Sequence, residues 1–253
     1  MKVIGFFGSD SQVGVSMIAE SISTYLSEKG SVLLISASGE KSVSYIKKET
    51  VHSLDYIRPN LLSGKLSKDD LEEIIEKDEK NGNLSFIAGV NSSYTSKLFP
   101  INTFDLILGA VNKYDYIVID GGHGLDKALT ISAFNACDLR YFVLTQQPKS
   151  IARFFDMKNY VLKPLGLEGE VIINKYIKDL SFYKTGEIEK MLGNKVSFLV
   201  PYSEYGWQAE YENKTLMKEK RYRKEIEKFG KYIESGSLQR EPRGIFSRRV
   251  HKQ

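Results

Sequence analysis

The sequence has little cysteine and no apolar run long enough to cross a membrane. Cys137 is the single cysteine among 253 residues, which excludes an intrachain disulfide. It lies in the apolar segment AFNACDLRYFVL, without an evident activating base, and this favours core packing over a catalytic thiol. No stretch reaches about 18 apolar residues, so no transmembrane helix is expected. The N-terminus has no extended apolar signal region, and we expect a cytoplasmic protein, at most peripheral to the inner face of the membrane.

A strong net charge is also lacking, because 36 basic residues nearly balance 32 acidic ones. The net charge of +4 does not by itself predict nucleic-acid binding. Basic residues nevertheless concentrate in residues 238–253, where they flank Ile245 and Phe246. Two interpretations remain open, a solvated flexible tail or a contact with anionic lipid, nucleic acid or an acidic partner. We therefore predict one domain over residues 1–237 and a basic tail over 238–253, with Arg240, Arg243, Arg248, Arg249 and Lys252 against Glu241.

Apolar runs typical of buried strands alternate with segments of helical periodicity along most of the chain. This alternation predicts an α/β fold, a single three-layer domain with a mostly parallel sheet and helices on both faces. A polar, helical segment is expected over residues 41–82, with Ser67 as an N-cap. The predicted strands are 2–7, 31–36, 84–89, 114–120, 139–145, 169–174 and 195–200, and the predicted helices are 15–29, 101–114, 125–136, one after Pro148, 181–192 and 214–234.

A loop with two glycines separates the first strand from the first helix. Such a loop presents backbone N–H groups to an anion, and the helix N-terminus adds partial positive charge. We call residues 8–14 the glycine loop. The full phosphate-binding signature requires a lysine immediately before the serine or threonine, and Val15 stands there, before Ser16. The loop alone is therefore weak evidence for nucleotide binding.

The segment YDYIVID supports the same site from another part of the chain. It predicts a central strand that ends at Asp120, and its carboxylate would emerge beside the glycine loop. We expect Ser16 and Asp120 to hold Mg²⁺ if the metal is bound. The alternative is that Asp120 caps the next helix and that Gly8 and Gly14 only make a tight turn.

Several motifs together resemble the MinD/ParA family of dimeric P-loop ATPases over residues 1 to about 205. DSQVGVS stands where the family has KGGVGKT, LLISAS resembles LLIDAD, and YDYIVIDGGHG resembles YDYIIIDTPPG. FVLTQQPKSIARF, VIINKY and LVPYSE resemble later family segments. The resemblance implies ATP with magnesium as ligand and a homodimer as assembly. It places the ligand-binding residues at Ser11, Gln12, Val13, Gly14, Val15, Ser16, Asn174 at the adenine and Pro201 beside it.

Three departures from the family fall on the chemistry: Val15 and Asp10 replace lysines, and Ser36 replaces an aspartate. A unit charge about 4 Å from a phosphate contributes roughly 4 kcal/mol at an effective dielectric near 20. Losing it without compensation would weaken affinity by about three decades. We expect ATP binding that is weak or lost and no efficient hydrolysis, which favours a pseudo-ATPase. Candidate replacement cations are Lys149, Arg153 and Lys175.

Three functions remain open. The altered loop most resembles the CpaE/TadZ branch, which implies a non-catalytic localisation or assembly factor for a membrane-associated machine such as a tight-adherence type IV pilus or secretion system. The alternative is an atypical partitioning ATPase that dimerises with ATP and binds DNA or membrane. A dinucleotide-binding enzyme is disfavoured by the wide spacing of the loop glycines. His123 is a solvated loop residue or part of a switch, and an aromatic group is expected either to bind protein partners or to pack on the domain, namely Tyr202, Tyr205, Trp207 and Tyr211.

Overall fold

The computed structural model describes residues 1–39, 45, 52–180 and 183–236. The predicted tail at 238–253 lies outside the described residues, as do part of the polar segment predicted over 41–82 and the first two residues of the helix predicted over 181–192. No helix in the described part is long and apolar enough to cross a membrane.

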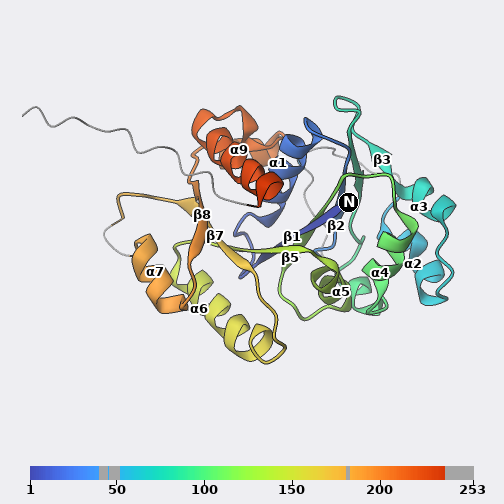
Figure 1. Ribbon diagram of the computed structural model, residues 1–253, viewed down its shortest axis with the longest axis horizontal. Helices are drawn as coiled ribbons and strands as arrows, with labels where there is room; N and C mark the ends of the chain where they lie inside the picture. Colours follow the sequence, from blue (N-terminus) through green and yellow to red (C-terminus); the bar gives the residue numbers. More distant parts are fainter. Residues whose placement is uncertain (40–44, 46–51, 181–182, 237–253) are drawn as a thin grey trace, which may run out of the picture.

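A single eight-stranded sheet forms the centre of the molecule, in the order β3-β4-β2-β5-β1-β6-β7-β8 (Figure 1). All neighbouring strands are parallel except β3, which pairs antiparallel with β4 at one edge. The seven predicted strands correspond to the six inner strands and to β8 at one edge, whereas the two-residue edge strand β3 was not predicted. The strands are β1 (Lys2–Gly8), β2 (Val32–Ser36), β3 (Glu76–Lys77), β4 (Leu84–Ile87), β5 (Tyr116–His123), β6 (Leu139–Leu144), β7 (Glu170–Tyr176) and β8 (Val196–Pro201).

Helices cover both faces of the sheet, which confirms the predicted three-layer α/β domain (Figure 1). On one face α1 (Val15–Ser27) packs against α9 (Lys220–Ser235). The other face carries the helices between β2 and β8. These are α2 (Leu54–Leu62), α3 (Lys68–Ile74), α4 (Thr103–Ala110), α5 (Ala128–Ala136), α6 (Pro148–Met157) and α7 (Thr185–Leu192); the short elements are the 3-10 turns η1 (Thr95–Leu98) and η3 (Leu216–Lys218), the π-helical turn η2 (Lys158–Leu162) and α8 (Gly206–Tyr211).

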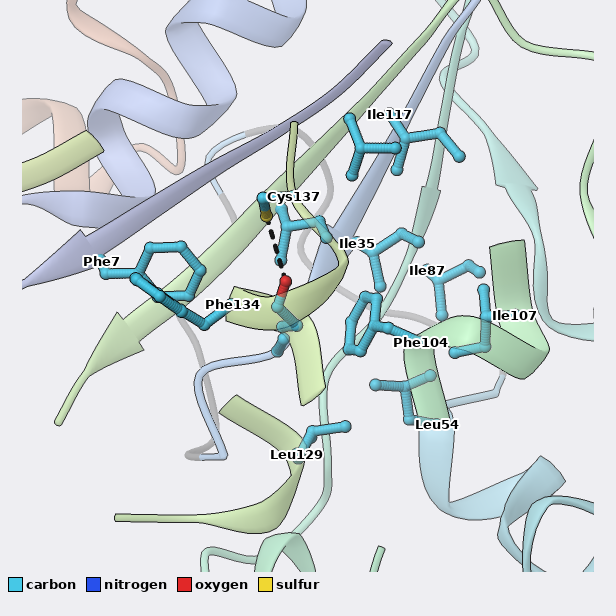
Figure 2. Close-up of a cluster of buried hydrophobic side chains, with 14 of the residues drawn as sticks. Phe7, Ile35, Leu54, Ile87, Phe104, Ile107, Ile117, Leu129, Phe134 and Cys137 are labelled. Carbon is cyan, nitrogen blue, oxygen red and sulfur yellow. Dashed lines mark hydrogen bonds between the residues drawn. The ribbon is translucent and has the colours of Figure 1, made fainter. Parts of the chain in front are cut away.

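Each face of the sheet has its own apolar core. Figure 2 shows part of the core beneath α4 and α5, where Phe7 and Phe134 meet edge to face with ring centroids 5.0 Å apart. Cys137 lies in this core, and its Sγ donates to the carbonyl of Ala133 at 3.1 Å. Burial raises the pKa of Cys137 to about 12, which keeps the thiol protonated. The prediction of core packing for this residue is therefore confirmed.

The prediction of one helical segment over residues 41–82 is wrong. In its described part, α2 and α3 are separate helices and a short edge strand, β3, follows them. Gly64, with a φ of 65°, turns the chain between the two helices. The predicted cap at Ser67 is confirmed, because Ser67 and Asp70 form a reciprocal capping box.

Helix α9 begins later than the helix predicted over 214–234. The reason is local, since the Glu219 carboxylate accepts hydrogen bonds from the backbone N–H groups of Arg221 and Tyr222 and so caps α9. The short helix α8 was not predicted. Strand β5 also continues past the predicted end at Asp120, through Gly121 and Gly122 to His123.

The strand order places the end of β1 between β5 and β6. Phe6 and Ser36 are both register partners of Asp120, so the carboxyl ends of β1, β2 and β5 meet at one edge. Open α/β sheets bind ligands outside the carboxyl ends of strands, where the strand order reverses. The glycine loop leaves β1 at this edge.

Candidate functional site

The glycine loop is a compact turn whose backbone needs its glycines. Gly14 has a φ of 91° and directly precedes α1 as its N-cap. A Cβ at Gly14 would lie 2.3 Å from Nδ2 of Asn174. A Cβ at Gly8 would lie 2.8 Å from a methyl of Val15 and 3.1 Å from the carbonyl oxygen of Asp10. Asp10 and Val15 therefore both lie close to Gly8, and the first turn of α1 begins directly after Gly14.

Two neighbouring side chains at the end of β7 hold the carbonyls of the loop. Nδ2 of Asn174 donates to the carbonyl oxygen of Val13 at 2.8 Å, and Nζ of Lys175 donates to that of Gln12 at 2.8 Å. Asn174 is buried, whereas Lys175 is exposed. Because these two side chains of β7 donate hydrogen bonds to the carbonyls of the loop, the loop conformation is fixed by residues far away in the sequence. The resemblance implies that Asn174 contacts adenine, whereas the contact in the structure is its hydrogen bond to the carbonyl of Val13 in the loop.

Ser16 and Asp120 meet beside the start of α1. The Ser16 hydroxyl donates to Oδ2 of Asp120 at 2.6 Å, and the backbone N–H of Gly122 donates to Oδ1 at 3.0 Å. Burial raises the pKa of Asp120, and these two hydrogen bonds act in the opposite direction. A hydroxyl and a carboxylate side by side are hard oxygen ligands of the kind that Mg²⁺ takes.

A magnesium ion at this point would have few protein ligands. The described residues contain no group of three or more histidine, cysteine, aspartate or glutamate side chains placed to hold a metal. Mg²⁺ commonly keeps several waters and binds through one or two protein oxygens together with ligand phosphates. Ser16 and Asp120 therefore fit a magnesium that arrives with a nucleotide.

Asp10 is buried at the other end of the loop and is paired with two cations of α6. Lys149 Nζ lies 3.2 Å from its Oδ2, and the Arg153 guanidinium donates to its Oδ1. The backbone N–H of Ser11 also donates to Oδ1, at 2.7 Å. Burial acts to raise the pKa of Asp10, but the hydrogen bond from Ser11 and the two cations outweigh it and lower the pKa. Two of the three candidate cations thus contact Asp10, and Lys175 contacts the carbonyl of Gln12.

The remaining two departures from the family motif have local roles. Val15 is 6% exposed and belongs to the apolar core under α1, so its side chain fills space beside Gly8. Ser36 stands opposite Asp120 at the end of β2. The half-buried His123 ends β5, where it is the register partner of Gly8.

A cavity of about 300 Å³ adjoins the glycine loop. Four of the predicted site residues line it, and two others, Val13 and Val15, are buried in the core instead. Ser11 is exposed outside the cavity lining. The predicted residues in the lining are Gln12, Gly14, Asn174 and Pro201, and residues that were not predicted for the site include Met17, Tyr45, Tyr202, Trp207, Glu210 and Tyr222.

Residues that line the cavity and were missed from the sequence come mainly from α8 and the segment before it. Trp207 is 85% exposed although it lines the cavity, and Tyr211 is 88% exposed. Ala209 is the buried residue of α8. The sequence indicates these aromatic residues as a group, but α8 has only 6 residues, which is too short for a helical period to predict that they surround a cavity.

A buried lysine near the end of β2 was also missed. Lys127 is buried, and its Nζ donates to the carbonyl of Ser38 at 3.4 Å. A Cβ at Gly122 would lie 2.5 Å from Cβ of Ser38, so this contact is close to the turn that follows Asp120. Lys127 lies inside the helix predicted over 125–136, and nothing in the sequence distinguishes it there from an exposed helical lysine. In the structure it directly precedes α5 as its N-cap.

Comparison with known proteins identifies the fold. No protein-family model and no curated protein matches the sequence. A ParA family ATPase from Chlorobium tepidum superposes with a TM-score of 0.77 at 20% identity, over 92% of this chain and 98% of that one. MinD from Pyrococcus horikoshii, solved with Mg-ADP, gives 0.75 at 17% identity, over 92% and 96%.

MinD from Aquifex aeolicus, in its complex with MinC, gives a TM-score of 0.75 at 17% identity, over 96% of this chain and 99% of that one. At these identities the likeness is one of fold. The described residues form a single α/β domain with the fold of the MinD and ParA P-loop ATPases.

Proposed function

We propose that this chain is a MinD/ParA-like protein that binds Mg-ATP weakly and acts as a localisation or assembly factor rather than as an efficient ATPase. The observation that carries the proposal is the hydrogen bond between Ser16 and Asp120, 2.6 Å long, beside a glycine loop that opens on a cavity of about 300 Å³. A hydroxyl, a carboxylate and a helix N-terminus are three of the parts with which P-loop proteins bind a magnesium polyphosphate, and the lysine is the part that this loop lacks.

In this proposal the cavity takes the base and the loop takes the phosphates. Four of the predicted residues line the cavity, namely Gln12, Gly14, Asn174 and Pro201. Asn174 and Pro201 would contact the adenine, and Gln12 and Gly14 would face the phosphates. Ser16 and Asp120 would hold Mg²⁺, which would supply positive charge against the phosphates of the nucleotide. The Mg-ADP complex of the Pyrococcus horikoshii MinD supports this choice of ligand by analogy of fold.

Weak affinity follows from the charges at the loop. Val15 is an apolar residue buried beside Gly8, so the position carries no cation. Asp10 adds a negative charge to the same loop and offsets one of the two positive charges of Lys149 and Arg153, so the three side chains together carry a charge of +1. Phosphoryl transfer depends on the positioning of the phosphates and on stabilisation of their charge. Loss of the cation at position 15 removes much of that charge stabilisation.

A role in assembly needs a surface for a partner, and the region of α8 supplies one. Between residues 202 and 212, four aromatic side chains are more than half exposed, and three exposed glutamates lie among them. Aromatic residues are enriched where proteins bind one another. We propose this surface as the contact with a membrane-associated machine, of which a tight-adherence type IV pilus or secretion system is our candidate. The aromatic residues are Tyr202, Tyr205, Trp207 and Tyr211, and the glutamates are Glu204, Glu210 and Glu212.

Calorimetry with Mg-ATP tests the proposal on the wild type, on Asp120→Ala and on Asp156→Ala, which removes an exposed acid from α6. We expect binding in the range of tens to hundreds of micromolar that Asp120→Ala loses and Asp156→Ala keeps. No heat of binding at millimolar ATP would reject a nucleotide site. Steady-state turnover of ATP at rates typical of the MinD and ParA ATPases would instead reject the non-catalytic role.

The second candidate is a partitioning-type ATPase that dimerises with ATP and binds DNA or membrane. Its specific support is the basic, partly apolar sequence of residues 238–253. Deleting these residues should then abolish binding to DNA or to anionic vesicles in the presence of ATP. Unchanged binding by the truncated protein would rule out this candidate. Loss of binding in the truncated protein, together with ATP turnover by the full-length protein, would favour the partitioning-type ATPase over the localisation factor.

A further inference from the structure

Asp10 and two residues of α6 form a charge cluster on the glycine loop. Lys149 and Arg153 are one helical turn apart, so they share a face of α6. Both reach the Asp10 carboxylate, whose side chain is 7% exposed, whereas the two cations are 63% and 49% exposed. A hydrogen bond of 2.8 Å between the hydroxyls of Ser9 and Ser150 attaches the same helix to the loop. The loop is thus attached to α6, which brings the half-exposed side chains of Lys149 and Arg153 within reach of Asp10.

The cluster lies on the same loop as Val15, the position that lacks a cation for phosphate. A methyl of Val15 and the backbone carbonyl of Asp10 both lie close to Gly8, and the carboxylate of Asp10 contacts α6. Lys149 and Arg153 therefore bring two positive charges to the loop in which Val15 supplies none. Lys175 also touches the loop, but it is bound to the carbonyl of Gln12 on the side of β7.

We infer that Lys149 and Arg153 are the cations that this loop offers to a polyphosphate, and that Asp10 holds them and lowers the affinity until the ligand competes for them. The inference rests on the proposed function, because it names the phosphate partners of the same site. The two cations and the carboxylate together contribute a net charge of only +1, and removal of the carboxylate charge would release both cations to the phosphates. Long, half-exposed side chains can change partner at little structural cost.

Asp10 remains an anion while it holds these cations. Its pKa is lowered by the Ser11 N–H and by both cations, against the effect of burial. Asparagine at this position would keep an oxygen acceptor for the Ser11 N–H and remove only the charge. Asp10→Asn is therefore the variant that separates electrostatics from loop geometry.

The test is calorimetric titration of Mg-ATP and, separately, of tripolyphosphate into four proteins. They are the wild type, Asp10→Asn, the triple variant with Asp10→Asn, Lys149→Gln and Arg153→Gln, and the control Asp156→Asn. The control changes the net charge by the same amount on an exposed part of α6. Circular dichroism and thermal unfolding verify that each protein is folded.

We expect Asp10→Asn to bind both ligands about tenfold more tightly than the wild type, which is a shift of about 1.4 kcal/mol. The triple variant should lose that gain, and the control should show none of it. An affinity of Asp10→Asn no higher than that of the wild type, or a gain that survives in the triple variant, overturns the inference.

The two ligands separate this inference from the proposed function. ATP binding by the wild type without a gain in Asp10→Asn keeps the function and overturns the inference. Tripolyphosphate binding that shows the gain, with no binding of ATP, supports the inference and rejects the nucleotide. If no variant binds either ligand, both are overturned.

Discussion

The two halves of the glycine loop are held in different ways. The second half, from Gln12 to Gly14, is fixed by short contacts from β7, and Ser16 just beyond it donates a hydrogen bond to Asp120 of β5. The first half is attached to α6 by a serine pair and by the charges around Asp10. The second half thus depends on geometry and burial, and the first on electrostatics.

This difference explains how a loop can keep its shape while its charge changes. The shape follows from positive φ angles at Gln12 and Gly14 and from buried neighbours that leave no room for a Cβ at Gly14. The charge is carried by long side chains that can be replaced without moving the backbone. Mutations in the two halves should therefore differ both in size and in their dependence on pH.

The largest effect is expected from Gly14→Ala. A non-glycine residue with a left-handed backbone costs roughly 1–2 kcal/mol, and the collision with Asn174 adds about 1–3 kcal/mol. Gly64→Ala is the matched control, since Gly64 has a φ of 65° with nothing within 4 Å of a Cβ. Equilibrium unfolding in urea measures both. Equal losses of stability would show that packing against Asn174 does not fix the second half of the loop.

The positions that can be predicted from the sequence are those with a strong local pattern. The apolar run before Asp120 and the glycines after the first strand place Asp120 and Ser16 at one edge of the sheet, and the structure joins them by a hydrogen bond. The contact of Asn174 with the loop has no such pattern. It joins residues 161 positions apart, and only the order of the strands brings them together.

The pairing of Asp10 with its partners lies outside sequence reasoning for the same reason. The sequence indicates Lys149 and Arg153 as two of three candidate cations for phosphate, and their spacing indicates a shared helix face, but nothing in it pairs them with Asp10. An acid in place of a lysine suggests repulsion toward phosphate, whereas the structure pairs that acid with two cations. Charge at a site is a sum over neighbours, and the sequence does not state which charges are neighbours.

An intermediate effect is expected from Ser16→Ala. The substitution removes one of the two hydrogen bonds to the buried Asp120 carboxyl, and leaving such a group short of a partner costs about 1–3 kcal/mol. Ser63→Ala, which removes an exposed hydroxyl bonded to the carbonyl of Asn60, should stay within about 0.5 kcal/mol. Urea unfolding of the two variants provides the comparison. A loss at Ser16 no larger than at Ser63 would mean that the contact with Asp120 adds nothing to stability.

The smallest effect on the free energy of unfolding is expected from Asp10→Asn. Its dependence on pH distinguishes the contribution of the Asp10 ion pairs from other effects of the substitution. The partners of Asp10 are half exposed, so the pairs contribute no more than about 1 kcal/mol at neutral pH. Because the pKa of Asp10 is lowered in the folded protein, its stabilisation is complete above the ordinary value of 3.8 and is lost as the pH falls through the lower, folded value. The difference in unfolding free energy between the wild type and Asp10→Asn should therefore shrink between pH 5 and pH 2.

Asp156→Asn serves as the control for this last measurement, because Asp156 is an exposed acid on the same helix. Its difference from the wild type should stay near zero across the range. If the Asp10 difference instead remained constant as the pH fell, the first half of the loop would be held by shape, as the second half is, and the contrast between the two halves would fail. A difference that shrinks with acid, beside a Gly14 effect that does not, would establish that one short loop combines a geometric half and an electrostatic half.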